Sequence, residues 1–399
     1  MAALATTASI IFILSTVVLF YTYVGYPLLV YAVSLFKPHR IERGNFTPPV
    51  TVIITAYNEE KDLAAKLENT LGLDYPKEKL EILVASDHSS DRTDEIARSF
   101  APRGVKLHRQ PERLGKTSAQ NTAVEMANGE IILFSDATTM YRPDALRALL
   151  PNFTDETVGC VSGKLIYVDP ANTGIGTGAK SYWSYETFLK EAESRACSLI
   201  GVSGCLYAVR RSAYVPMYPE ACSDFLIATK IYEQGLKTVY EPGAVCTEET
   251  NRQAGRELQM RVRVISQTYT DLWRHLYMMN AFKTGFYAVQ LFSHKVLRYS
   301  VPLWLALLLG SSFTLSFSYD LFLIITLLQF AFYGIAVLSW LLGRGGKNTG
   351  LMAVPQYFVL ANAASVIAFF RFIRGEKLAT WEPIREQVNE SPNASGQTS

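Results

Sequence analysis

Long apolar stretches constrain the fold of this chain more than any other feature. Residues 9–36 contain no Asp, Glu, Lys or Arg, and a helix of this length exceeds the about 20 residues that cross a bilayer. Three further apolar stretches of spanning length follow at residues 296–317, 321–342 and 351–370. We therefore predict a membrane protein with transmembrane helices at both ends of the chain and four spans in total.

Basic residues beside the first stretch indicate its orientation. Residues 1–10 carry no Lys or Arg, whereas Lys37, His39, Arg40 and Arg43 follow the apolar run directly. A cleaved signal peptide would need a basic leader, so the stretch is expected to remain as an anchor. Because cytosolic flanks are enriched in Lys and Arg, the chain after this anchor is expected in the cytosol. The expected location is the plasma (inner) membrane, as a multi-pass protein with a cytosolic catalytic domain.

The last apolar stretch leaves the topology open. Arg344 and Lys347 favour the cytosolic side for the loop before it, but a full crossing by residues 351–370 would leave the basic residues at 371–377 outside. Either this stretch is re-entrant and returns the tail to the cytosol, or the positive-inside bias is violated here.

The composition fits a protein that combines membrane segments with a more polar domain. The chain has 399 residues, of which 49% are hydrophobic and 19% charged, too apolar for an ordinary soluble enzyme and too charged for an all-membrane bundle. Its five cysteines show no C-x-x-C spacing, so neither a zinc site nor a disulfide framework is indicated. The net charge of +2 says little about partners, and no nucleic acid is expected.

Between the first two apolar stretches, short apolar runs alternate with helical patterns. The alternation predicts an α/β domain with a mostly parallel sheet covered on both faces. The expected strands are residues 50–55, 80–85, 105–108, 131–134, 158–168 and 205–209, and the expected helices are residues 59–73, 92–100, 223–234 and a segment from residue 116. The predicted parts are an N-terminal anchor and basic linker (1–44), this domain (45–275), an interfacial helix (276–295), three membrane segments (296–375) and a polar tail (376–399).

Residues 115–138 carry the most informative local pattern. Lys116 opens a helical segment, and the apolar run at 131–134 ends abruptly at Ser135 and Asp136. In open α/β sheets, ligands bind beyond the carboxyl ends of the strands, and a helix N-terminus beside a lysine suits a phosphate. An anion and a carboxylate able to bind a metal are therefore expected to meet here.

Polar residues also follow the first two predicted strands. Tyr57 and Glu59 come directly after the first strand, where Tyr57 could stack on a base, although a turn with favourable early acids is an equally good interpretation. Asp87 and Asp91 follow the second strand. Asp91 could simply cap a helix, whereas Asp87 precedes the cap and is expected to point into the same crevice.

The order of these motifs resembles a known family. AYNE, SDHSSDRT, GKTSAQN, FSDAT, SGCLYAVRR, SDF and QMRVR follow one another between residues 48 and 300, as in family 2 inverting glycosyltransferases of the GT-A fold. The membrane-anchored hyaluronan, chitin-oligosaccharide and cellulose synthases belong to this group. The resemblance implies a Rossmann-like GT-A fold, a nucleotide-sugar donor that is UDP-linked, and transfer with inversion to a cell-surface polysaccharide or lipid-linked acceptor.

The resemblance also assigns residues on the donor side. It implies that Asp87 contacts the uracil, that Tyr57 packs near the base and that Lys116 lies near the diphosphate. Asp136 matches the first acid of the D-x-D motif that holds Mg²⁺ or Mn²⁺, but Thr138 stands where the second acid is expected. Because these cations prefer charged oxygen ligands, the second protein ligand is left open.

On the acceptor side, the resemblance makes Asp224 the catalytic base, which takes the proton from the acceptor hydroxyl. The alternative is that Asp224 is only a helix N-cap. Arg261 and Arg263 match the region that clamps the diphosphate, or they belong to a basic amphipathic helix on anionic headgroups. Val264 replaces the tryptophan of processive relatives, so short products or single additions are expected.

Two other functions stay open from the sequence. The chain could transfer one sugar to a polyprenyl phosphate, or it could be a catalytically weak subunit that scaffolds or exports a glycan. The carboxylates Asp136 and Asp224 favour an enzyme, whereas Thr138 and the missing tryptophan favour a weak subunit. The donor sugar, the acceptor and the oligomeric state are not indicated.

Overall fold

The computed structural model describes residues 2–36, 41–168, 174–249, 254–344 and 349–380. Four residues on which the topology was predicted, Lys37, His39, Arg40 and Lys347, lie outside the described residues, as does the predicted tail beyond residue 380.

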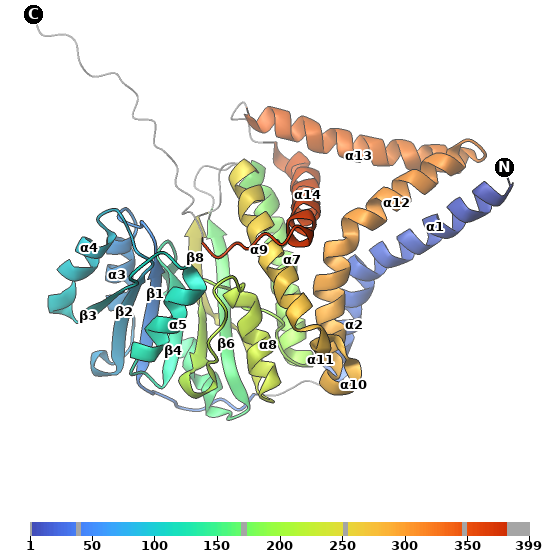
Figure 1. Ribbon diagram of the computed structural model, residues 1–399. Helices are drawn as coiled ribbons and strands as arrows, with labels where there is room; N and C mark the ends of the chain where they lie inside the picture. The colour runs from blue at the N-terminus through green and yellow to red at the C-terminus, as the bar shows by residue number, and fades with distance from the viewer. Residues whose placement is uncertain (1, 37–40, 169–173, 250–253, 345–348, 381–399) are drawn as a thin grey trace, which may run out of the picture.

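An eight-stranded mixed sheet forms the centre of the domain, in the order β3-β2-β1-β4-β7-β6-β8-β5 (Figure 1). The strands are β1 Val50–Ala56, β2 Leu80–Ser86, β3 Val105–Arg109, β4 Ile131–Asp136, β5 Met140–Tyr141, β6 Val158–Val168, β7 Tyr207–Arg210 and β8 Lys237–Glu249. Strands β1 to β4 are parallel, β7 is antiparallel to both of its neighbours, and β5 is antiparallel to β8. The predicted α/β fold is confirmed. The long strand β8, which brings residues to the site, was not predicted.

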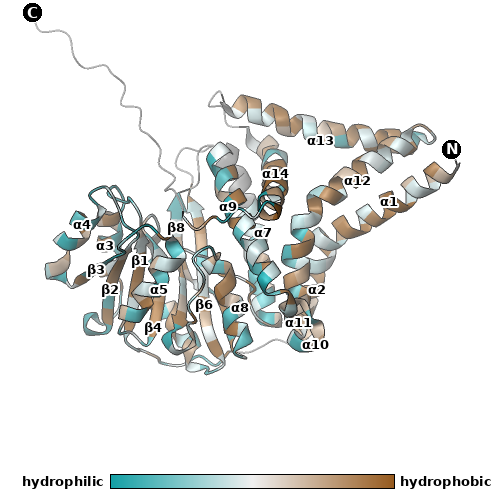
Figure 2. Ribbon diagram, in the orientation of Figure 1, coloured by the Kyte–Doolittle hydropathy of each residue, from teal (hydrophilic) through white to brown (hydrophobic). Residues whose placement is uncertain are grey.

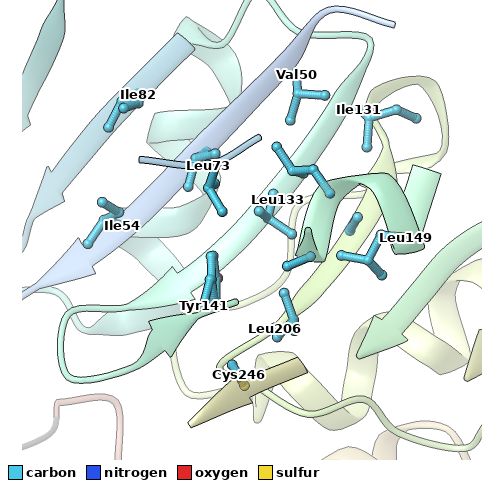
Figure 3. Packing of buried hydrophobic residues seen from close by; sticks show 14 of the residues in the cluster. Val50, Ile54, Leu73, Ile82, Ile131, Leu133, Tyr141, Leu149, Leu206 and Cys246 are labelled. Atoms are coloured by element: carbon cyan, nitrogen blue, oxygen red, sulfur yellow. The ribbon is translucent and has the colours of Figure 1, made fainter. Parts of the chain in front are cut away.

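Helices cover both faces of this sheet. They are α3 Leu63–Leu71, α4 Thr93–Ser99, α5 Lys116–Met126, α6 Ala145–Leu149, α7 Gly174–Ala196, α8 Ser223–Glu233 and α9 Ala254–Arg274. All seven residues of β1 are buried, which explains its continuous apolar run, because a central parallel strand is covered on both sides. Val50 and Ile54 pack on one face with Leu133 and Tyr141, as Figure 3 shows, and Ile53 packs on the other.

The apolar helices α1 Ala2–Phe20, α12 Arg298–Ser316 and α13 Asp320–Arg344 extend away from the domain (Figure 2). The other helices of this part are α2 Tyr26–Phe36, joined to α1 by a π-helical turn at Tyr21–Gly25, then α10 Ala281–Thr284, α11 Phe286–Leu291, joined to α12 by a π-helical turn at Phe292–Leu297, and α14 Ala353–Ile373. Among the described residues, four helical stretches are long and apolar enough to cross a membrane: Ala3–Phe36, Phe286–Ser316, Asp320–Gly343 and Gly350–Ile373.

The structure divides the helix that was expected at the interface. A break at Gly285, with φ of +60°, separates the short helix α10 from α11. From Phe286 onward the chain is continuous with the second apolar helix. Residues 281–297 therefore form two short α-helices and a π-helical turn instead of the single interfacial helix expected at residues 276–295, because Gly285, with its positive φ, ends α10.

Helix α14 differs from the other apolar helices because it packs along α9 of the domain. Near its start, the Tyr357 hydroxyl donates to Glu257 at 2.8 Å, and Ala364 packs on Val262 further along. Beyond its end, the Gln267 side chain donates to the Leu378 carbonyl at 2.6 Å. Both ends of α14 therefore lie against the domain, which favours the re-entrant alternative for this stretch.

Candidate active site

Side-chain hydrogen bonds tie together the loops after β1 and β2. Asn58 and His88 have positive φ angles, 55° and 59°, a left-handed conformation that Asn and His adopt more readily than most residues. The Asn58 side chain accepts from the backbone N–H groups of Ser90 at 2.7 Å and Asp91 at 3.3 Å. Asp91 itself accepts from the Thr93 amide at 3.0 Å, so it stabilises the start of α4.

Asp87 lies at this edge of the sheet and is fully buried. Its carboxylate accepts hydrogen bonds from the Gln110 side chain at 2.9 Å and from the backbone N–H groups of Leu114 at 2.9 Å and Gly115 at 3.0 Å. Burial raises the pKa of Asp87, and the two backbone donors oppose this shift. Asp87 thus fixes the loop before α5, and its contact with a nucleotide base stays a prediction.

Tyr57 and Glu59 take different positions after β1. The guanidinium carbon of Arg113 lies 3.9 Å from the centre of the Tyr57 ring, so an aromatic face and a cation meet at the predicted base site. The backbone of Glu59 donates to the Thr93 hydroxyl at 2.7 Å, and its carbonyl accepts from the amide of Leu63, where α3 begins. The backbone of Glu59 thus takes part in the turn before α3.

Lys116 and Asp136 are brought together as predicted. The ammonium group of Lys116, at the first position of α5, is paired with the Asp136 carboxylate at the end of β4. Burial lowers the pKa of Lys116, but the Asp136 carboxylate outweighs this effect, so the net shift is upward. The pair places a cation beside a carboxylate at the carboxyl edge of the sheet.

A buried lysine that the sequence analysis missed supports the turn after Asp136. The Lys66 ammonium group donates to the Thr139 carbonyl at 2.8 Å and lies 3.5 Å from the centre of the Tyr141 ring. Burial lowers the pKa of Lys66 to about 7. The Thr139 hydroxyl donates to the Asp136 carbonyl at 3.1 Å, which closes the turn. A lysine on the apolar face of the predicted helix was the only signal.

Glu248, at the end of β8, was also missed. The Thr138 hydroxyl donates to its carboxylate at 3.2 Å. Burial and the negative charge of Asp136 raise the pKa of Glu248 to about 7. A carboxylate therefore stands beside Thr138 although it comes from a distant part of the chain.

Asp224 lies in the first turn of α8. Helix α8 begins at Ser223 with Cys222 before it, and the Asp224 carboxylate accepts from the Cys222 thiol at 2.9 Å. A Cβ atom at Gly204 would lie 3.0 Å from the second Asp224 oxygen. The structure therefore places Asp224 inside the helix rather than at its N-cap. At position 204, a residue larger than glycine would bring its Cβ atom close against the Asp224 carboxylate.

Asp271 on α9 positions the residues before Asp224. Its buried carboxylate accepts from the Cys222 backbone N–H at 3.0 Å and from the Tyr218 hydroxyl. Burial raises the pKa of Asp271 to about 7. No local motif marked this residue, because its partners lie about fifty positions earlier in the chain.

Arg261 and Arg263, the two arginines predicted to clamp the diphosphate, lie in different surroundings. Burial lowers the pKa of Arg263, and Cys222, Asp136 and Asp224 oppose the shift, which is consistent with a guanidinium close to both carboxylates. Arg261 instead donates to Glu257 at 2.8 Å and to the Tyr357 hydroxyl of α14. The contacts therefore use Arg261 to hold α14, whereas Arg263 is the arginine whose charge interacts with Asp136 and Asp224.

Two lysines line the side of Asp224 that faces the apolar helices. The Lys190 ammonium group donates to the Ser203 hydroxyl at 2.9 Å, one residue from Gly204, and lies 5.4 Å from the centre of a Trp183 ring. The Lys295 ammonium group lies 5.5 Å from the centre of the Phe225 ring. No carboxylate within ion-pair distance is found for either lysine in the described part of the chain.

A buried polar network joins helix α7, which carries Lys190, to the apolar helices. His294 bridges two carboxylates of α7, contacting Glu193 at 2.7 Å and Glu186 at 3.2 Å. Tyr26 of α2 donates to Glu193, and Arg298 of α12 pairs with Glu186. The first and second apolar helices are thus attached to α7 beside the site.

Comparison with known proteins identifies the domain. The model of the family described as glycosyl transferase family 2 matches residues 51–215. The chain is 28% identical over 217 residues to a probable glycosyltransferase, YdaM, of Bacillus subtilis (strain 168), covering 51% of each chain. It is 27% identical over 221 residues to the poly-beta-1,6-N-acetyl-D-glucosamine synthase of Staphylococcus aureus (strain COL), covering 54% of this chain and 53% of the synthase. The chain thus spans about half the length of these curated relatives.

A solved structure extends the fold comparison to the apolar helices. The mannosyltransferase PcManGT from Pyrobaculum calidifontis, solved with GDP-Man and Mn²⁺, superposes with a TM-score of 0.69 at 23% identity, covering 92% of this chain and 99% of that one. The family resemblance of the motif order and the family match therefore agree. Residues 51–215 thus match a glycosyl transferase family 2 domain, and the fold of the chain is GT-A.

Proposed function

We propose that this protein is a membrane glycosyltransferase that transfers a sugar from a nucleotide-sugar donor, UDP-linked by the family resemblance, to a glycan or lipid-linked acceptor. The observation that carries the proposal is the ion pair of Lys116 and Asp136 at the carboxyl edge of the sheet. The charge of Asp224, after that of Asp136, also contributes to the raised pKa of Lys116, so Asp224 lies in the same region. A scaffold would need neither a cation placed for a phosphate nor a carboxylate placed for a base. The relatives, one named a probable glycosyltransferase and one a poly-beta-1,6-N-acetyl-D-glucosamine synthase, support the same conclusion.

The donor would lie across the carboxyl ends of β1, β2 and β4. Tyr57 and Arg113 would contact the base, and Lys116 and Arg263 would bind the diphosphate. In the transfer step, Asp224 takes the proton of the acceptor hydroxyl while that oxygen bonds to the anomeric carbon. The bond from this carbon to the diphosphate breaks on the opposite face, and the electron pair leaves with the nucleoside diphosphate, so the anomeric centre is inverted.

A divalent cation suits the carboxylate at the end of β4. Lys116 already pairs with Asp136, so this carboxylate lies where a positive charge is stabilised. Carboxylate oxygen is the donor that Mg²⁺ and Mn²⁺ prefer, and we propose Asp136 as a ligand. When bound, the cation neutralises diphosphate charge and makes the leaving group better. The Mn²⁺ in the PcManGT complex is consistent with this proposal.

The acceptor would approach Asp224 from the side of the apolar helices. Lys190 and Lys295 line this approach, and the Glu186 and Glu193 network attaches it to α2 and α12. Among the described residues, neither lysine has a carboxylate within ion-pair distance, which favours an anionic acceptor, so transfer to a polyprenyl phosphate is the second candidate function. Either acceptor is consistent with a multi-pass protein of the plasma (inner) membrane whose domain faces the cytosol.

A donor panel tests the proposal. The full chain in detergent micelles with mixed lipids would be given UDP- and GDP-linked sugars with Mg²⁺ or Mn²⁺, and release of the nucleoside diphosphate would be measured. We expect release from at least one donor, its loss in chelator and its loss in Asp136→Ala. Release that persists at full rate in excess chelator would reject the metal assignment, and no release from any donor with lipid acceptors present would favour the scaffold.

A further inference from the structure

We propose that Glu248 supplies the second carboxylate of the metal site, in place of the acid that the family pattern has at Thr138. The inference rests on the proposed function, because it concerns the divalent cation that would neutralise the donor diphosphate. It assigns a metal ligand to a strand that lies more than one hundred residues after the D-x-D position.

The first support is the direct contact between the two side chains. The Thr138 hydroxyl donates to the Glu248 carboxylate at 3.2 Å. A second acid at position 138 would carry its oxygen atoms close to where that hydroxyl lies. The Glu248 carboxylate is thus one hydrogen bond away from the expected ligand position, and the longer Glu side chain reaches it from the neighbouring strand.

Backbone pairing fixes this geometry. Strand β5 pairs antiparallel with β8, with Met140 opposite Thr247 and Tyr141 opposite Cys246. The segment that follows Asp136 and the end of β8 are therefore parts of one ladder. A ligand pair taken from two strands of the same sheet keeps its spacing better than one taken from free loops, as preorganised metal sites require.

The charges at the site are consistent with a divalent ion. In the structure Asp136 is paired with the Lys116 ammonium group, a single positive charge. Asp136 and Glu248 together would offer two negative charges, and Thr138 adds a neutral hydroxyl oxygen. No group of three or more His, Cys, Asp or Glu side chains able to hold a metal is found in the described residues, so the remaining ligands would be donor phosphate oxygens and water, as is usual for Mg²⁺ at phosphates.

Moving the carboxylate from position 248 to position 138 distinguishes a metal ligand from a residue that only accepts the hydrogen bond of Thr138. The variants are Glu248→Gln, Thr138→Asp and the double variant, with Glu125→Gln as control because Glu125 is exposed on α5. Binding of Mn²⁺ to the full chain in detergent micelles would be read from the EPR signal of the free ion, with UDP in one series and GDP in another. Thermal unfolding without metal would report the stability of each variant.

If Glu248 is a ligand, Glu248→Gln weakens Mn²⁺ binding by about tenfold or more, at least the effect that outer-shell metal partners show. The double variant should recover binding to within a few-fold of the parent, because the carboxylate is returned to position 138. Binding by Glu248→Gln that equals the parent would overturn the proposal. So would a loss that the double variant does not recover, since Glu248 would then act in some other way than as the second carboxylate.

The outcome is separable from that of the proposed function. If donor turnover does not depend on metal, the proposed metal dependence fails together with this inference. If turnover is lost in chelator and in Asp136→Ala while Glu248→Gln binds Mn²⁺ like the parent, the proposed function stands and only the role of Glu248 is rejected.

Discussion

The donor side of the domain takes most of its polar side chains from the ends of β1, β2 and β4 and the start of α5, with Arg263 added from α9 (Figure 1). The acceptor side takes them from α7, α8, the later part of α9 and the helix that begins at Phe286. On the donor side, Asp87, Lys116 and Asp136 follow local strand and helix ends. On the acceptor side, the neighbours of Asp224 are contacted by residues far apart in the chain: Lys190 contacts Ser203, Asp271 contacts Cys222 and Lys295 contacts Phe225. The first arrangement follows from sheet geometry, and the second depends on how the apolar helices pack against the domain.

The comparison predicts separable losses of function. Variants of the donor side should weaken nucleotide binding, because their contacts are with the diphosphate or the cation. Variants of the acceptor side should leave nucleotide binding intact and reduce transfer or acceptor affinity. A donor-side variant that lowers only transfer, or an acceptor-side variant that weakens nucleotide binding, would contradict this division.

The largest expected effect is that of Asp224→Asn. Loss of a general base typically costs about 10²- to 10⁴-fold in rate, and the amide keeps the size of the side chain beside Gly204. We expect turnover, measured as nucleotide release in the presence of acceptor, to fall by this amount. Glu233→Gln, at the other end of α8, is the control and should retain parent activity. Turnover of Asp224→Asn within a few-fold of the parent would remove Asp224 from the role of base.

A smaller effect is expected from Lys295→Ala. A hydrogen bond to a charged group contributes about 1.5 to 3 kcal/mol, so losing one of two lysines should raise the KM for an anionic lipid acceptor about tenfold. The KM for the donor should stay unchanged. Lys283→Ala is the matched control, because Lys283 is an exposed lysine on α10. An equal rise in donor KM would place Lys295 on the donor side and contradict the comparison.

The smallest effect concerns Asp271 and pH. Its pKa in the folded protein, about 7, lies above that of an exposed aspartate, about 4. Between these values the folded state holds a proton that the unfolded state has released, so stability falls as pH rises from about 4 to about 7 and is level above. The slope from this group is at most about 1.4 kcal/mol per pH unit. Thermal unfolding of Asp271→Asn across this range should show a flatter dependence, and an unchanged slope would exclude Asp271 as its source.

The same comparison explains what the sequence could predict. The strands that lead to Asp87 and Asp136 and the helix that starts at Lys116 were predictable, because the rule that ligands bind at the carboxyl ends of parallel strands needs only local patterns. The GT-A fold and the family followed from the order of the motifs. Asp224 was predictable only from the resemblance, since a lone acid near a helix start is often a cap.

Other residues could not be predicted because long-range packing brings them to the site. Glu248 reaches Thr138 through the pairing of β5 with β8, and β8 was not predicted as a strand. Lys66 and Asp271 are buried polar side chains on helices, where spacing alone cannot distinguish a buried partner from an exposed one. Arg261 was assigned to the diphosphate from its position in a motif, but it contacts α14, whose packing against α9 the sequence left open.

The most direct test of the division between a donor side and an acceptor side is to measure nucleotide affinity in one variant from each side. The affinity for UDP, and in parallel for GDP, would be measured by calorimetry with Mn²⁺ on the parent, Lys116→Ala and Asp224→Asn in the same micelles. We expect Asp224→Asn to bind within about twofold of the parent and Lys116→Ala to bind about tenfold or more weakly, because only Lys116 loses a charged contact to the diphosphate. Equal weakening by both variants, or parent affinity in Lys116→Ala, would contradict the account.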